Sequence, residues 1–149
     1  MKSPVLDVKL TGYAKLAKVL TAFADDGTYR GAFRDAMTTI LEHMRDYAAR
    51  ITHVDTGMLQ DSHRVEYDSH RMRGRLYIDP LALAITRTGR LRFPLLFVAE
   101  YAKWEHDRGG SHAFYDRTMK QAAPEAAALG IKSIVSYLDT RASRRNYAD

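Results

Sequence analysis

The chain has 149 residues, of which 46% are hydrophobic and 28% are charged, as in globular domains and unlike disordered or fibrous chains. It contains no cysteine, which excludes disulfides, zinc–thiolate sites and thiol nucleophiles and favours an intracellular folding compartment. The formal net charge is +5, and we expect one domain over residues 1–139, followed by a basic, flexible tail over 140–149.

The N-terminal region predicts a short strand and a short helix. Residues 5–10 carry β-branched side chains after Pro4, which is typical of a strand. From Tyr13 to Phe23 apolar residues recur at helical spacing, and Asp25-Asp26-Gly27 ends the pattern. This region lacks the apolar core of a signal peptide, and no run of about 18 apolar residues predicts a membrane span anywhere in the chain.

The strongest periodic pattern predicts a long amphipathic helix from Thr28, as its N-cap, to Ile51. At ~1.5 Å per residue this helix would extend for roughly 35 Å and form the spine of the domain. Its apolar residues fall on one stripe at steps of three and four, namely Tyr29, Ala32, Phe33, Ala36, Met37, Ile40, Leu41, Met44, Tyr47, Ala48 and Ile51.

The chain is expected to turn between this helix and a strand-rich segment. Asp55-Thr56-Gly57 predicts a tight turn or a cap, because Asp and Thr side chains bond nearby N–H groups and Gly tolerates positive φ. Residues 63–67 and 74–78 alternate polar with apolar side chains and predict a β-hairpin with a basic tip. Asp79-Pro80 ends the second strand, because proline cannot donate into a ladder.

The second half of the chain predicts a loop and a final helical region. Apolar segments at 81–85 and 91–98 flank residues 86–90, a second basic loop or hairpin, and Gly109-Gly110-Ser111 predicts a flexible turn. Pro124 and Gly130 predict a kink or two shorter helices. Buried positions of this region are expected at Phe114, Thr118, Ala122, Ala126, Leu129, Ile134, Tyr137 and Leu138.

Residues 71–92 form a strongly basic segment with a single acid, Asp79. Arginine binds phosphate in a forked geometry, and summed positive charge attracts nucleic acid. An alternative interpretation is a solvated hairpin surface. Because no sequence-specific DNA-binding motif accompanies the segment, any contact would follow the phosphate backbone. The candidate partner-facing or DNA-facing residues are Arg71, Arg73, Arg75, Arg87, Arg90 and Arg92.

We find no convincing motif for catalysis or for a metal. His106 and His112, with Glu105 and Asp107, are the densest group of metal-ligand types, but the Gly109-Gly110 turn separates the two histidines, which lack the four-residue spacing of a helical metal pair. The glycines also lack the lysine of a phosphate-binding loop. We therefore predict no catalytic residue, no metal and no cofactor.

The neighbours Asp61, Ser62 and His63 contain the residue types of a nucleophilic triad. Such a triad is defined by spatial roles and not by adjacency in sequence. On an alternating strand, Ser62 and His63 would point to opposite faces. We expect no triad here and no enzyme.

Three segments resemble the family of tailed-bacteriophage neck and tail-completion proteins. Val54-Asp55-Thr56-Gly57-Met58-Leu59 is similar to its Val-Asp-Thr-Gly-x-Leu signature. Tyr101-Ala102-Lys103-Trp104-Glu105-His106-Asp107 resembles its Tyr-Ala-x-Tyr-Val-Glu-Phe-Gly segment at Tyr101, Ala102 and Glu105. Residues 113–119 resemble its Pro-Phe-Leu-Arg-Pro-Ala-Leu segment at Phe114 and roughly at Arg117. The chain departs from the family pattern at Ala113, at Gly109 and in an apparent insertion over 81–97.

The resemblance implies an α+β fold in which the long amphipathic helix packs on a small, mainly antiparallel β-sheet, with a C-terminal helix. The residue patterns agree, because a helix stripe and a hairpin can bury a core together. It also implies a non-enzymatic virion protein that joins or completes the tail at the head-to-tail interface, as a ring subunit around the DNA channel. Asp55, Thr56, Gly57, Tyr101, Trp104, Glu105 and Phe114 would then be structural.

The implied partners are copies of itself in heterologous contact, other neck, connector or tail proteins, and genomic DNA without sequence preference, with no membrane. The implied location is the virion neck or tail, and the host cytoplasm during assembly. Two alternatives remain open. The first is a free-standing basic nucleic-acid-binding protein, and the second is a metal-dependent hydrolase using His106, His112 and Glu105.

Overall fold

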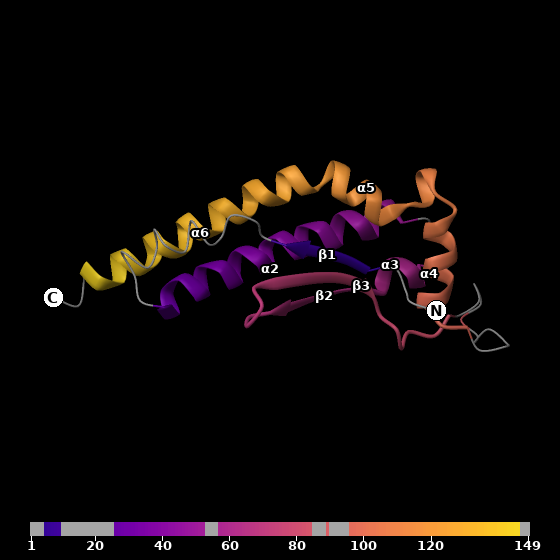
Figure 1. Ribbon diagram of the computed structural model, residues 1–149, viewed down its shortest axis with the longest axis horizontal. Coiled ribbons are helices and arrows are strands. Elements are labelled where there is room, and N and C mark those ends of the chain that lie inside the picture. The colour runs from indigo at the N-terminus through magenta and orange to yellow at the C-terminus, as the bar shows by residue number, and fades with distance from the viewer. Residues whose placement is uncertain (1–4, 10–25, 53–56, 85–88, 90–95, 147–149) are drawn as a thin grey trace.

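Helix α2, Asp26–Ile51, is the central element of the fold in our computed structural model (Figure 1). It lies between the C-terminal helix α6, Ala123–Asn146, and a three-stranded antiparallel sheet. The structure describes residues 5–9, 26–52, 57–84, 89 and 96–146. The predicted α+β class, with a long helix on a small sheet and a C-terminal helix, is confirmed.

The apolar stripe of α2 is buried on two sides. Ala32, Phe33 and Ala36 pack with Ile134 of α6, while other stripe residues join a larger core beneath the sheet. The predicted N-cap is wrong, because α2 begins at Asp26 and Thr28 lies inside its first turn. The helix predicted over 13–23 lies outside the described residues.

The sheet has the strand order β1-β3-β2, with β1 at Val5–Lys9, β2 at His63–Asp68 and β3 at Arg73–Ile78. The predicted N-terminal strand and hairpin are therefore confirmed. On β3, Leu76 and Ile78 face α2 and are buried, whereas Arg75 is exposed on the outer face. At the hairpin tip the Asp68 carboxylate accepts the backbone N–H groups of residues 70 and 71, which lowers the pKa of Asp68.

The junction between α2 and the sheet contains a short helix that was not predicted, α3, Met58–Asp61. Gly57 precedes it with φ +80°, a conformation that favours glycine. Leu59 is buried in the core. Asp55 and Thr56 lie outside the described residues.

Beyond the sheet, an antiparallel bridge joins Leu83 to Phe97, and α4 then occupies Val98–Asp107. The flexible turn predicted at Gly109-Gly110-Ser111 is partly ordered as the 3-10 helix η1, Gly110–His112. Helix α5, Phe114–Gln121, follows and leads into α6. The basic loop predicted at 86–90 lies outside the described residues except for Gly89.

The predicted interruption of the last helical region occurs at Ala122, between α5 and α6, with Pro124 at the second position of α6. The interruption predicted at Gly130 is wrong, because α6 continues through this residue. The helix extends as far as Asn146, beyond the start of the tail predicted at residue 140. Gly130 instead permits close packing on α2. A Cβ atom there would lie 2.5 Å from Cδ1 of Ile40.

We expect Gly130→Val to lower the free energy of unfolding by about 1–3 kcal/mol, because the added atoms overpack the contact between α6 and α2. Intrinsic helix propensity favours valine over glycine by a few tenths of a kcal/mol, so any loss must come from packing. Urea denaturation followed by circular dichroism measures the change. Ala127→Val, on the exposed side of α6, is the control and should cost less than about 1 kcal/mol.

Candidate functional site

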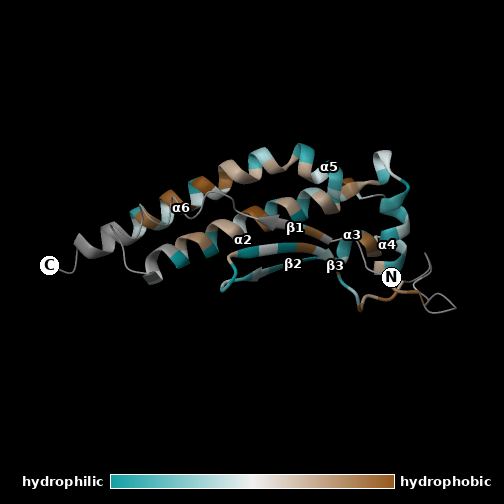
Figure 2. Cartoon of the chain, in the orientation of Figure 1, coloured by the Kyte–Doolittle hydropathy of each residue, from teal (hydrophilic) through white to brown (hydrophobic). Residues whose placement is uncertain are grey.

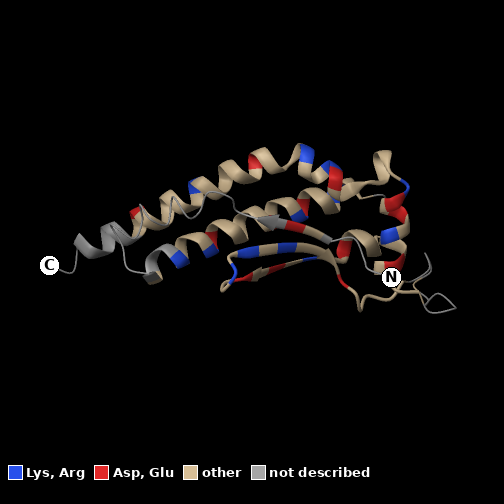
Figure 3. Cartoon of the chain, in the orientation of Figure 1, with Lys and Arg blue, Asp and Glu red and all other residues tan. Residues whose placement is uncertain are grey.

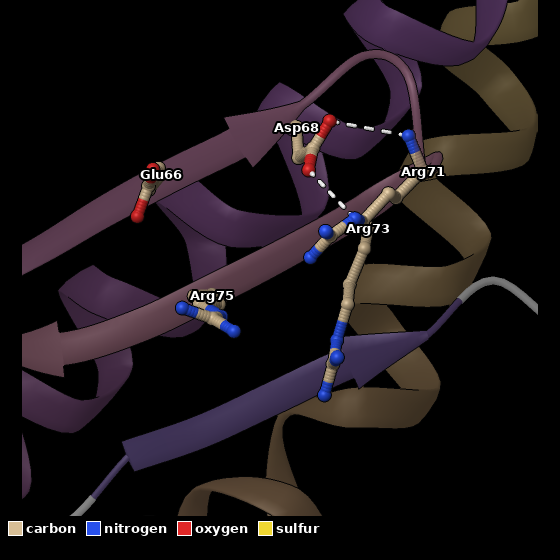
Figure 4. A pocket seen from close by; sticks show the side chains of 5 residues that line it. All are labelled: Glu66, Asp68, Arg71, Arg73 and Arg75. Atoms are coloured by element: carbon tan, nitrogen blue, oxygen red, sulfur yellow. Dashed lines mark hydrogen bonds and ion pairs between the residues drawn. The ribbon is translucent and has the colours of Figure 1, made fainter.

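Three of the six candidate arginines lie together on the outer face of the sheet. Arg71 is in the hairpin turn, and Arg73 and Arg75 are on the central strand β3. With Glu66 and Asp68 of β2 they line a shallow pocket of about 200 Å³ (Figure 4). Arg87, Arg90 and Arg92 lie outside the described residues.

Acidic residues neutralise these arginines. The strand register places Arg75 between Asp7 of β1 and Glu66 of β2. Arg73 reaches across to β1, where its Nη2 lies 2.5 Å from Oδ2 of Asp7, and Nε of Arg75 lies 3.3 Å from Oδ1 of the same carboxylate. Figure 3 shows the basic positions of β3 beside strands that carry acidic positions, and Arg75 has an acid opposite it on each side.

Arg71 also has an acidic partner, because its Nε lies 3.7 Å from Oδ2 of Asp68 (Figure 4). Arg64 at the other end of β2 pairs with Asp79 at 3.5 Å. Exposed ion pairs of this kind contribute only about 0–1 kcal/mol each. The described outer face therefore carries charges of both signs and is not a wholly cationic patch.

Asp7→Asn should cost less than about 1 kcal/mol in stability while leaving Arg73 and Arg75 without their shared partner. If the balance of charge limits DNA binding, this variant should bind a DNA duplex more tightly than the wild type at low salt. Fluorescence anisotropy with labelled duplex measures the affinity. The control is Glu42→Gln, an equal change of charge at an exposed position of α2. It should change the affinity for the duplex less than Asp7→Asn does.

The segments that resemble the phage family converge at one end of the core. Phe114, at the start of α5, is buried in the same cluster as Leu59 of α3 and Ala102 of α4. Tyr101 packs against this cluster, whereas Trp104 is 60% exposed. The sequence separates Leu59 from the other two segments by about 40 residues, and the fold brings it to them, whereas the segments around Tyr101 and Phe114 are near neighbours in sequence.

Glu105 has a buried carboxylate that contacts residues on both sides of the Gly109-Gly110 turn. Its side chain contacts Nδ1 of His112 and lies 3.3 Å from Nη1 of Arg108. The ring of His106 packs instead on Phe114, with centroids 5.0 Å apart. Of the four candidate metal ligands the structure thus brings only Glu105 and His112 into contact, and across the described part of the chain no three such side chains form a metal-binding group.

Sequence reasoning missed a buried hydrogen-bond chain that joins α2, β2 and α5. Thr52 donates its hydroxyl to the carbonyl of Ala48 at 2.6 Å, so its oxygen accepts from Nε2 of His63 at 3.0 Å. Neutral histidine has one N–H, and Nδ1 therefore accepts from the Tyr115 hydroxyl at 3.3 Å. Burial, and to a smaller extent the charge of Arg64, lowers the pKa of His63 to about 4, which keeps the ring neutral.

Burial also raises the pKa of Tyr115, which keeps its hydroxyl protonated as the donor. The supposed triad does not form, because Ser62 donates to the carbonyl of Met58 and Asp61 is exposed. In the alternating pattern of the predicted strand, His63 occupies a position that faces the core. The pattern could therefore have predicted that its side chain is buried. Thr52 and Tyr115 could not have been assigned to it from sequence spacing.

Comparison with protein families, curated proteins and solved structures found no match to the chain. Among the described helices, none has the length and apolar content required to cross a bilayer.

Proposed function

We propose that this chain is a structural virion protein of the phage neck, which joins or completes the tail at the head-to-tail interface as a ring subunit around the DNA channel. The observation that carries the proposal is the convergence of three family-like segments, around Gly57, Tyr101 and Phe114, on one end of an α+β core. A resemblance spread over unrelated surfaces would carry much less weight.

The surfaces of the molecule also support an assembly role. Helix α2 has 26 residues, which corresponds to roughly 39 Å, and pairs closely with α6 to form a stiff rod. The outer sheet face offers charges of both signs, and Trp104 and Ile131 are large apolar side chains exposed on helices. Interfaces between subunits combine an apolar core with a polar rim, and these surfaces offer both kinds of residue.

The alternative of a free-standing nucleic-acid-binding protein depends on the same arginines. Arg73 and Arg75 share Asp7, and Arg71 pairs with Asp68, so a phosphate would have to compete with carboxylates already in place. We therefore propose the virion role ahead of it. Within a ring, contact with DNA would follow the phosphate backbone and would weaken steeply with salt.

Disruption of the gene in its phage or prophage tests the proposal, with particles examined by electron microscopy. We expect filled heads beside unattached or abnormal tails, and restoration of normal particles when an intact copy is supplied in trans. Normal infectious particles without the gene would contradict the proposal.

A further inference from the structure

Two imidazole rings contact the first turn of α5. We define the histidine-aromatic cluster as His63 of β2, His106 of α4, and Phe114 and Tyr115 of α5. The ring centroid of His63 lies 5.6 Å from that of Phe114 and 5.6 Å from that of Tyr115, while the ring of His106 lies 5.0 Å and 6.0 Å from the same two rings. The start of α5 therefore contacts both β2 and α4 through an imidazole.

The buried ring of His63 has no acid to balance a positive charge. Its two nitrogens contact the hydroxyl groups of Thr52 and Tyr115. Among the described residues, ion pairs between histidine and a carboxylate occur at His43 and His112, and not at His63. A second proton on His63 therefore places an unpaired charge in the core, which is costly unless the ring reaches water.

The charges nearest the cluster do not relieve this cost. On the strand β2, the charge of Arg64 disfavours a second positive charge beside it. The carboxylate of Glu105 already contacts His112 and Arg108, and protonation of His112 would strengthen that pair. Helix α2 contributes the uncharged Thr52, and β3 places the uncharged Ile78 opposite His63. The remaining acids nearest to the cluster in sequence are exposed, namely Asp61, Asp107 and Asp116.

The two ends of the fold are held unequally. Helices α2 and α6 form the most extensive contact between any two elements, and they share a core cluster of their own around Phe33 and Ile134. Figure 2 shows hydrophobic positions along both of these helices. Helix α4 makes much smaller contacts, chiefly with α3, β3 and η1, and Nδ1 of His106 on this helix is buried without a hydrogen-bond partner. A segment held by few contacts opens before the rest of a fold.

We propose that His63 makes this end of the fold open in acid, so that α4, η1 and the first turn of α5 separate from the sheet while the α2–α6 pair stays folded. Departure of Phe114 and Tyr115 uncovers the ring of His63 and lets water stabilise its charge. The opening is local and reversible, and it acts on the end of the core where the family-like segments lie. It does not depend on the proposed role in a phage.

Hydrogen–deuterium exchange of the full chain, followed by mass spectrometry at about pH 7 and about pH 5 and corrected for intrinsic exchange rates, tests the proposal. At the lower pH, peptides from residues 98–121 should have protection factors at least about 10-fold below those of peptides from residues 30–48 of α2. Burial lowers the pKa of His63 from 6.5 to about 4. The fall in protection of residues 98–121 between the two pH values should therefore be about 20-fold larger in the wild type than in His63→Gln.

The matched control is His70→Gln, which removes a histidine from the exposed hairpin turn and should keep the wild-type fall in protection. Circular dichroism at neutral pH checks that each variant is folded, and His63→Asn replaces His63→Gln if the latter unfolds. Two results would overturn the proposal. The first is equal protection of residues 98–121 and 30–48 in acid, and the second is a His63→Gln chain whose protection falls as much as that of the wild type.

Discussion

The Phe114→Ala variant is expected to lose about 3–5 kcal/mol in free energy of unfolding. Phe114 is 1% exposed and occupies the centre of an aromatic cluster. Its ring centroid lies 4.7 Å from that of Tyr115, 5.0 Å from that of His106 and 5.6 Å from that of His63. Truncation removes buried apolar area and edge-to-face contacts, and it leaves a cavity where α4, α5 and β2 meet.

Urea denaturation measures this loss, and Met119→Ala is the matched control. Met119 lies on the same helix, α5, and is 42% exposed, so its truncation should cost less than about 1 kcal/mol. A loss of under about 1 kcal/mol for Phe114→Ala would contradict the packing described for this end of the core.

Stability is expected to fall as the pH is lowered from about 6.5 to about 4, because His63 is buried in its neutral form. Its pKa is lowered from 6.5 to about 4 in the folded chain, so in this window the unfolded chain binds more protons. At roughly 1.4 kcal/mol per pKa unit, the contribution of His63 that is lost is about 3 kcal/mol. This contribution is fully present above pH 6.5.

The matched variant is His63→Gln, which removes the titrating ring while keeping a hydrogen-bonding side chain. It should be less stable than the wild type at neutral pH, and its stability should depend less steeply on pH between 6.5 and 4. Chemical denaturation at a series of pH values measures both slopes. Equal slopes for the two proteins would mean that His63 is not buried in its neutral form.

The sequence predicted the elements whose signals are local. The stripe of α2 repeats at helical spacing over 20 residues and more, and the alternation of residues 63–67 and 74–78 specifies a hairpin with one buried face. Phe114, Thr118, Ala122, Ala126 and Ile134 are buried as predicted for the final helices.

The parts that could not be predicted depend on contacts between distant segments. Asp7 balances Arg73 across 66 residues, so counting charges within residues 71–92 overstated the positive field of that surface. Gly130 looked like a helix breaker because its packing on Ile40 is invisible in a local window. The short helix α3 has four residues, too few to produce a periodic pattern.

The residues of the candidate site could also be predicted only in part from the sequence. Tyr101, Glu105 and Phe114 could be singled out by resemblance, but their physical roles required the fold. Glu105 is buried and braces the glycine turn through His112 and Arg108, while Trp104, its neighbour in sequence, is exposed. Adjacent residues of one helix thus have opposite environments, because α4 packs on the core through one side only.

The proposed role at the phage neck is tested by the position of the protein in purified phage particles, determined by gold labelling of a terminal affinity tag and electron microscopy. If the protein joins the head to the tail, label is expected at the head-to-tail junction, in particles that remain infectious with the tagged protein. Particles that are infectious but carry no label, with the tagged protein found only outside the virion, would contradict it.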